Sequence, residues 1–68
     1  MSELAINLKR LRNKEGLTQV EISRELGIPL STYRNWEKRG KGHRTPDVKV
    51  LAKLAEVLNT TIDELVGR

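Results

Sequence analysis

The 68-residue chain contains no cysteine and no phenylalanine, and it has only one histidine, one tyrosine and one tryptophan. Without cysteine there is no disulfide framework and no thiolate metal site. The lone histidine, His43, stands among scattered carboxylates, and no serine has a base at a spacing typical of an activated nucleophile. These absences argue against an enzyme, so we expect no catalytic residue, no metal and no cofactor.

Long apolar runs are also missing. No stretch approaches the roughly 20 apolar residues of a membrane-spanning helix, and the start MSELAINLKRLR lacks the basic-then-apolar layout of a signal peptide. We therefore expect a cytoplasmic protein with no membrane partner. The length predicts a single domain, residues 1–68, which without disulfides depends on well-formed helices or on a partner chain.

Positive charge is concentrated in the middle of the chain. The net charge is +4, and residues 28–49 carry six Lys or Arg against two Asp or Glu. The flanking segments are nearly balanced, with five against four in residues 1–27 and two against three in residues 50–68. A local basic surplus suits a polyanion such as nucleic acid. Charge alone leaves open the alternative of an ordinary solvated face.

Apolar residues recur at helical spacing and predict five helices and no strand. We expect the helices at about residues 2–14, 18–26, 30–38, 46–58 and 62–66. Ser23, Arg24 and Glu25 are expected on the outer face of the second helix. The inward-facing residues predict one core, made of Leu4, Ala5, Leu8, Leu11, Ile22, Leu26, Ile28, Tyr33, Trp36, Val50, Leu51, Leu54, Ala55, Leu58, Ile62 and Leu65.

Capping residues mark the ends of these helices. A threonine three residues before a glutamate has the spacing of a capping box, in which each side chain accepts from the other residue's backbone N–H. Proline suits the first helical position, and glycine or asparagine suits the left-handed residue that ends a helix. We expect N-caps at Ser2, Thr18, Thr45 and Thr61, capping boxes to Glu21 and Glu64, and helix ends at Gly16, Gly27 and Asn59.

Residues 18–37 read as two short helices joined by a tight turn at Gly27-Ile28-Pro29. A helix-turn-helix of this size can place its second helix in the major groove of DNA. With Tyr33 and Trp36 facing inward, four outer side chains of that helix suit base edges. They are Leu30 for a thymine methyl, Ser31 for a base or a phosphate, Arg34 for guanine and Asn35 for adenine. Taken one at a time, each is better explained as an ordinary surface residue, but the four together on this frame favour contact with bases.

Other polar residues around the motif suit the DNA backbone or the scaffold. Gln19, at the start of the second helix, suits a phosphate, although it reads equally as a neutral surface glutamine. Arg12 and Glu37 both border apolar positions, and they are either a buried bidentate ion pair or two unrelated surface charges. Cations that would clamp the DNA backbone and make affinity salt-dependent are Lys38, Arg39, Lys41, His43 and Arg44, of which Arg44 is the best candidate for a minor groove.

The stretch LTQVEISRELGIPLSTYRNWEK resembles the helix-turn-helix of lambda-type phage repressors and Cro proteins, the XRE family of bacterial regulators. The matching elements are Leu17-Thr18-Gln19, Leu26-Gly27-Ile28, Trp36-Glu37, Thr45-Pro46-Asp47 and Ile62-Asp63-Glu64-Leu65. The resemblance covers essentially the whole chain and implies an all-α, compact five-helix domain. It also implies sequence-specific binding to double-stranded operator DNA by a transcriptional regulator, usually a repressor and usually a homodimer.

By position, the resemblance places Gln19 at a phosphate, Leu30, Ser31, Arg34 and Asn35 at the bases, and Arg12 with Glu37 in an internal ion pair. Two residues depart from the family pattern: Pro29 replaces the usual Ser or Thr cap, and Leu30 stands where many members have a polar residue. The loop between Glu37 and Pro46 is also longer than is common. The alternative function is that of an antitoxin or adaptor with a protein partner, and an exposed apolar patch at Val57, Ile62, Leu65 and Val66 would favour it.

Overall fold

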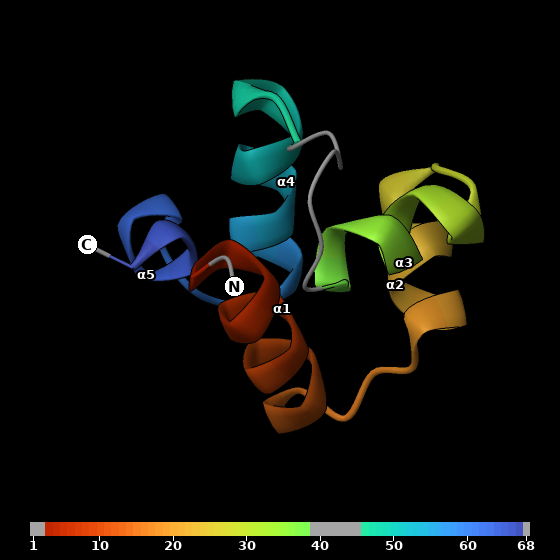
Figure 1. Cartoon of the computed structure of the whole chain (residues 1–68), viewed down its shortest axis with the longest axis horizontal. Coiled ribbons are helices and arrows are strands. Elements are labelled where there is room, and N and C mark those ends of the chain that lie inside the picture. The colour runs from red at the N-terminus through yellow and green to blue at the C-terminus, as the bar shows by residue number, and fades with distance from the viewer. Residues whose placement is uncertain (1–2, 39–45, 68) are drawn as a thin grey trace.

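The computed structural model describes residues 3–38 and 46–67, and all the regular secondary structure in these residues is helical (Figure 1). The five helices are α1 (Glu3–Lys14), α2 (Gln19–Leu26), α3 (Leu30–Glu37), α4 (Val48–Val57) and α5 (Ile62–Val66). The five-helix, all-α fold predicted from the sequence is confirmed, and the predicted boundaries lie within two residues of those observed.

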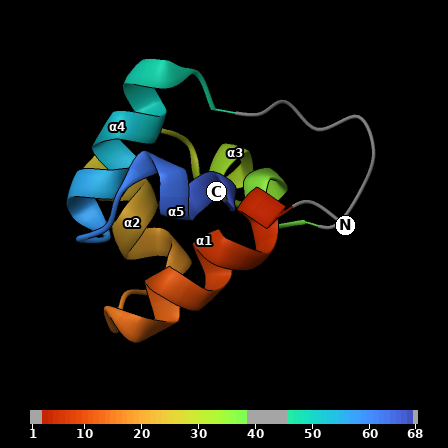
Figure 2. The same ribbon diagram turned by 90° about the vertical axis from the view of Figure 1, so that its left-hand side faces the viewer.

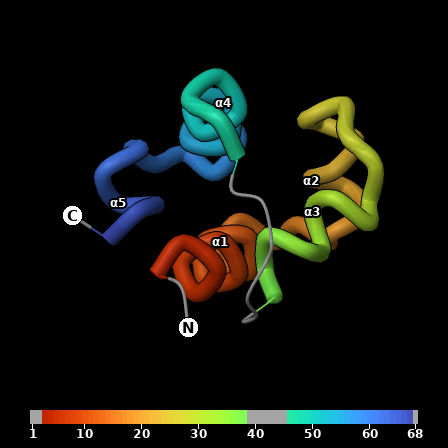
Figure 3. The backbone as a smooth tube through the Cα atoms, turned by 45° about the horizontal axis from the view of Figure 1, so that its top comes forward, coloured from red at the N-terminus to blue at the C-terminus, as the bar shows by residue number. Residues whose placement is uncertain are grey.

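Helices α1 and α4 occupy the middle of the molecule. The α2–α3 pair lies on one side of them and α5 on the other, as Figures 1 and 3 show from two directions. Figure 2 shows α5 lying across the space between α1 and α4, and it packs against both. On the opposite side, α3 packs against α1 and α2 packs against α4. The helix-turn-helix is therefore held through both of its helices.

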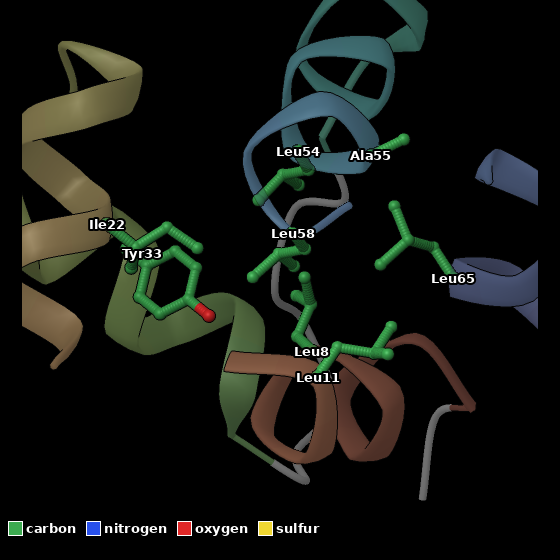
Figure 4. Close-up of a cluster of buried hydrophobic side chains, with 8 residues drawn as sticks. All are labelled: Leu8, Leu11, Ile22, Tyr33, Leu54, Ala55, Leu58 and Leu65. Atoms are coloured by element: carbon green, nitrogen blue, oxygen red, sulfur yellow. The ribbon is translucent and has the colours of Figure 1, made fainter. Parts of the chain in front are cut away.

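One apolar cluster joins these elements (Figure 4). Leu8 and Leu11 of α1 share this cluster with Leu54 and Leu58 of α4, and all four are at most 3% exposed. The α2–α3 pair adds Ile22 and Tyr33, and α5 adds Leu65. Because burying one large apolar side chain contributes about 1.5–3 kcal/mol, this shared cluster is the main force that holds the helix-turn-helix in a fixed orientation.

The start and the end of α2 follow the predicted capping pattern. The Thr18 hydroxyl accepts from the Glu21 backbone N–H at 3.1 Å, and the Glu21 carboxylate accepts from the Thr18 backbone N–H at 2.9 Å. At the other end, Gly27 has a φ of +69°, and the Ile28 N–H donates to the Ser23 carbonyl at 3.0 Å. These contacts satisfy groups that a helix end otherwise leaves unpaired, so the turn into α3 is well defined.

Two of the other capping predictions were wrong. The N-cap of α4 is Asp47, whose carboxylate accepts from the Val50 backbone N–H at 2.9 Å, so Pro46 precedes the cap instead of opening the helix. A carboxylate is a stronger acceptor than a hydroxyl and also complements the helix dipole. At α5, Thr61 accepts from the Glu64 N–H, but the Glu64 carboxylate accepts from the Thr60 hydroxyl at 2.6 Å, so only half of that capping box forms. The predicted caps Ser2 and Thr45 lie outside the described residues.

Burial also corrects three expectations. Ser23, expected on the outer face of α2, is only 4% exposed, and its hydroxyl donates to the Val20 carbonyl at 2.8 Å. A hydroxyl that bonds within its own helix turn is cheap to bury. Leu30 is half-buried and not fully outside. The suggested apolar patch near the C-terminus does not stand exposed, because Leu65 is fully buried and Val57 and Ile62 pack against the core.

A buried asparagine that the sequence did not point out ties α5 to α1. The Asn7 side-chain amide donates to the carbonyls of Glu64 and Leu65 at 3.0 and 3.1 Å, and Asn7 is only 8% exposed. These carbonyls belong to the last turn of a five-residue helix, which has no further turn to supply partners. Asn7 therefore adds side-chain donors at the C-terminal end of α5, where the Gly67 backbone N–H also donates to the Glu64 carbonyl at 3.3 Å.

Candidate nucleic-acid interface

Helix α3 has one face in the core and one face in solvent. Tyr33 is fully buried, and Trp36 is half-buried against it in an edge-to-face contact with ring centroids 6.1 Å apart. Helix α3 begins without a side-chain cap, because its N-cap residue is Pro29, with φ −63° and ψ 144°. Pro29 thus replaces the cap without displacing the start of the helix beyond Leu30.

The predicted base-reading residues share the outer side of α3. Ser31, Arg34 and Asn35 are exposed, and Leu30 is half-buried at the edge of that surface. Residues three and four apart are neighbours on a helix, so Ser31, Arg34, Asn35 and the exposed Lys38 form one continuous surface. This surface combines a fork-shaped donor, an amide and a hydroxyl, which are the groups that read base edges.

Gln19 is the first residue of α2, and its side chain turns toward the end of α3. Its Nε2 donates to Oε1 of Glu37 at 3.1 Å. A carboxylate can only accept, so this contact fixes which end of the Gln19 amide faces Glu37. The predicted phosphate ligand is therefore already held by a partner, with one of its two amide hydrogens engaged.

Glu37 lies at the junction of α1, α2 and α3. Arg12 Nε donates to its Oε2 at 2.7 Å and Arg12 Nη2 donates to its Oε1 at 3.2 Å, while the Arg12 and Glu37 side chains are 11% and 4% exposed. Tyr33 donates its hydroxyl to the same Oε2. Arg12 also donates through Nη1 to the Leu17 carbonyl at 2.8 Å, which secures the loop before α2.

The ionisation of this cluster follows from its contacts. Burial alone would raise the pKa of Glu37, but hydrogen bonds from Arg12, Tyr33 and Gln19 outweigh it and lower the pKa. The hydrogen bond to Glu37 raises the pKa of Arg12. Burial, and then the bond to Glu37, raises the pKa of Tyr33 well above its ordinary range. The cluster therefore holds one carboxylate, one guanidinium and one neutral phenol near neutral pH.

Sequence reasoning did not identify Tyr33 and Gln19 as partners of Glu37. Tyr33 and Glu37 are four residues apart on one helix, so their spacing was a usable signal. The contact between Gln19 and Glu37 joins two helices, and no local pattern reveals it.

Of the predicted phosphate ligands, Gln19 and Lys38 lie in the described part of the chain, whereas Arg39, Lys41, His43 and Arg44 lie outside it.

Two negative findings apply to residues 3–38 and 46–67. They contain no group of three or more His, Cys, Asp or Glu side chains arranged to hold a metal ion. None of their helices is both long enough and apolar enough to cross a membrane.

The family model for helix-turn-helix proteins matches residues 8–65. This match covers most of the chain, and the chain belongs to that family; the sequence-based prediction of the XRE type of helix-turn-helix is confirmed. The matched region begins within α1 and ends in α5, so the family unit includes the scaffold as well as α2 and α3.

Similar proteins include two curated bacterial and phage proteins and one solved structure. The HTH-type transcriptional regulator AnsR of Bacillus subtilis is 41% identical over 61 residues, which are 90% of this chain and 50% of AnsR. The cryptic phage CTXphi transcriptional repressor RstR of Vibrio cholerae is 35% identical over 68 residues, which are 100% of this chain and 55% of RstR. A transcriptional regulator from Listeria innocua superposes with a TM-score of 0.82 at 32% identity, covering 100% of this chain and 61% of that one. The chain thus spans about half the length of the curated relatives that it matches.

Proposed function

We propose that this chain binds double-stranded DNA in a sequence-specific manner and acts in transcriptional regulation, as a repressor. In this proposal residues 1–68 form one DNA-binding domain, and α3 enters the major groove. The observation that carries the proposal is the exposed surface of α3, where Ser31, Arg34 and Asn35 lie side by side on a helix that is anchored to α1 through Glu37 and Arg12. The names of the similar regulators and repressors support the same function.

The contacts divide into two roles. Leu30, Ser31, Arg34 and Asn35 face the bases, where Arg34 pairs with guanine and Asn35 with adenine through two hydrogen bonds each. Phosphate contacts fix the register of α3 and carry the salt dependence. They come from Gln19 and Lys38, and from the basic residues that follow Lys38 in the sequence: Arg39, Lys41, His43 and Arg44.

The protein binds DNA as a homodimer in this proposal. Two copies separated by one helical turn of DNA would read the two halves of a palindromic site. Sedimentation of the protein alone and of its complex with duplex DNA tests this part. A complex that holds one copy of the chain on a palindromic site at saturating protein would contradict it.

The role is non-enzymatic and cytoplasmic in the same proposal, with no membrane partner. Each inference has its own support: the chain has no cysteine and a single histidine, and the described helices include none that could span a membrane.

Selection from a random pool of duplex DNA tests the proposed function. The immobilised protein is expected to enrich one sequence motif over successive rounds, and binding of that motif should weaken steeply as salt is raised. A pool that stays random would contradict sequence-specific binding and would favour the alternative, an antitoxin or adaptor whose main partner is another protein. Arg34→Ala is the comparison variant, because it should bind the enriched motif with a reduced preference over unrelated sequences.

A further inference from the structure

Helix α1 lies outside the helix-turn-helix, yet one of its lysines borders the surface proposed to meet DNA. An open cleft lies where α1, the start of α2 and the end of α3 come together. Its lining side chains are Lys9, Arg12, Gln19, Arg34, Glu37 and Lys38. Lys9, Arg34 and Lys38 are all exposed, and the ion pairs found among the described residues involve none of them.

The single carboxylate in this cleft, Glu37, is not expected to repel a bound anion. Glu37 accepts from Arg12 twice, from Tyr33 and from Gln19, so its two oxygens are saturated and its charge is matched by the Arg12 guanidinium. The cleft is thereby left with three unmatched cations. Gln19 donates one amide hydrogen to Glu37, and its second amide hydrogen stays available. Glu37 therefore also serves as a positioning residue for the Gln19 amide.

We propose that this cleft binds one phosphate of the DNA backbone, with Lys9 supplying a contact from α1 beside Gln19 and Lys38. The inference rests on the proposed function and extends it by adding a phosphate ligand outside the helix-turn-helix. A phosphodiester fits the chemistry because it offers a full negative charge and oxygen acceptors to ammonium and amide donors. The cleft adjoins the outer face of α3 through Arg34 and Lys38, so the same phosphate would border the groove that α3 enters.

The first test compares Lys9→Gln with Lys53→Gln. Both variants lose one positive charge from an exposed helical lysine, but Lys53 lies on α4, in a separate groove beside Glu15, Glu25 and Glu56. Binding of the intact chain to a duplex enriched from a random pool is measured by fluorescence anisotropy across a salt series. Lys9→Gln is expected to weaken binding about three- to tenfold and to reduce the slope of log K against log salt by about 0.9, the value for one lost phosphate contact. Lys53→Gln is expected to leave the slope unchanged.

The second test locates the phosphate. Each phosphate of the duplex is replaced in turn by a neutral methylphosphonate. Among the phosphates at which the wild type loses affinity, one in each half-site should no longer affect binding by Lys9→Gln or by Gln19→Ala. Losses that map to different positions for these two variants would overturn the common site. Equal behaviour of Lys9→Gln and Lys53→Gln would overturn the inference alone, whereas a wild type that binds no duplex would overturn the proposed function itself. Far-UV circular dichroism of each variant confirms that the helices are retained.

Discussion

Removing the Glu37 side chain is expected to have a large effect on the stability of the fold. Glu37→Ala takes away the partner of a guanidinium that is 11% exposed and leaves the Tyr33 hydroxyl without its acceptor. Removing one member of a buried ion pair costs about 3–5 kcal/mol, because an uncompensated charge stays in the interior. A domain of this size has a total stability of about 3–10 kcal/mol, at roughly 0.05–0.15 kcal/mol per residue. Glu37→Ala is therefore expected to leave the protein marginally folded.

The contacts also predict an order between the two partners. When Arg12 is removed, the Glu37 carboxylate keeps the donors of Tyr33 and Gln19. When Glu37 is removed, Arg12 keeps the Leu17 carbonyl and its contact with the Tyr33 hydroxyl, neither of which carries a negative charge. Arg12→Ala should therefore destabilise the protein less than Glu37→Ala does. The double variant should cost less than the sum of the two single variants, by about 0.5–3 kcal/mol.

Urea unfolding followed by circular dichroism at 222 nm measures these free energies. The control is Lys53→Ala, which breaks the surface ion pair between Lys53 and Glu56 at 3.6 Å, where the side chains are 51% and 77% exposed. Such a pair contributes at most about 1 kcal/mol. If Glu37→Ala cost no more than this control, or if Arg12→Ala were the more destabilising variant, the reasoning about the buried cluster would be refuted.

Four further predictions concern the same structure. Because the folded pKa of Glu37 lies below its ordinary value of 4.5, its stabilising contribution is present above that pH and is lost as the pH falls through the lowered pKa; unfolding of Glu37→Gln should depend less steeply on acid. Because the folded pKa of Tyr33 lies above its ordinary value of 10.0, its contribution is complete below pH 10 and is lost as the pH rises further; Tyr33→Phe should flatten the alkaline limb of a stability profile. Asn7→Ala should cost about 1–3 kcal/mol, with faster hydrogen exchange in α5, since the Leu65 and Glu64 carbonyls both lose the Asn7 amide and the Glu64 carbonyl keeps the Gly67 N–H. Gly27→Ala should cost about 1–2 kcal/mol because φ is +69°, and Gly27→Asn should cost less; equal melting temperatures for these two variants would contradict a purely conformational effect.

Local patterns predicted most of the fold. Apolar spacing located all five helices, and the Thr18–Glu21 capping box and Gly27 fixed the ends of α2 because those contacts are made within a few residues. Where two residues competed for one role, sequence was less informative. The N-cap of α4 is Asp47, two residues after the predicted Thr45.

Contacts between distant segments were harder to predict. The pairing of Arg12 with Glu37 followed from family resemblance, but the addition of Gln19 and Tyr33 depends on how three helices meet. The placement of Lys9 in the same cleft was equally hard to predict, since α1 and α3 are distant in the sequence and meet only in the folded protein. Ser23 was wrongly predicted for a different reason. Its hydroxyl bonds to a carbonyl of its own helix, which permits the side chain to be buried, and the sequence gives no sign of this bond.

In the proposed function, the outer face of α3 reads the DNA sequence. The most direct measurement is the ratio of Kd values for an unrelated duplex and for the selected site, determined for Arg34→Ala, Asn35→Ala and Lys38→Ala at one salt concentration. Arg34→Ala and Asn35→Ala are each expected to lower this ratio about five- to 150-fold, the equivalent of about 1–3 kcal/mol for one bidentate base contact. Lys38→Ala should weaken both complexes alike and leave the ratio unchanged. A ratio that stays at the wild-type value in both Arg34→Ala and Asn35→Ala would contradict sequence reading by α3.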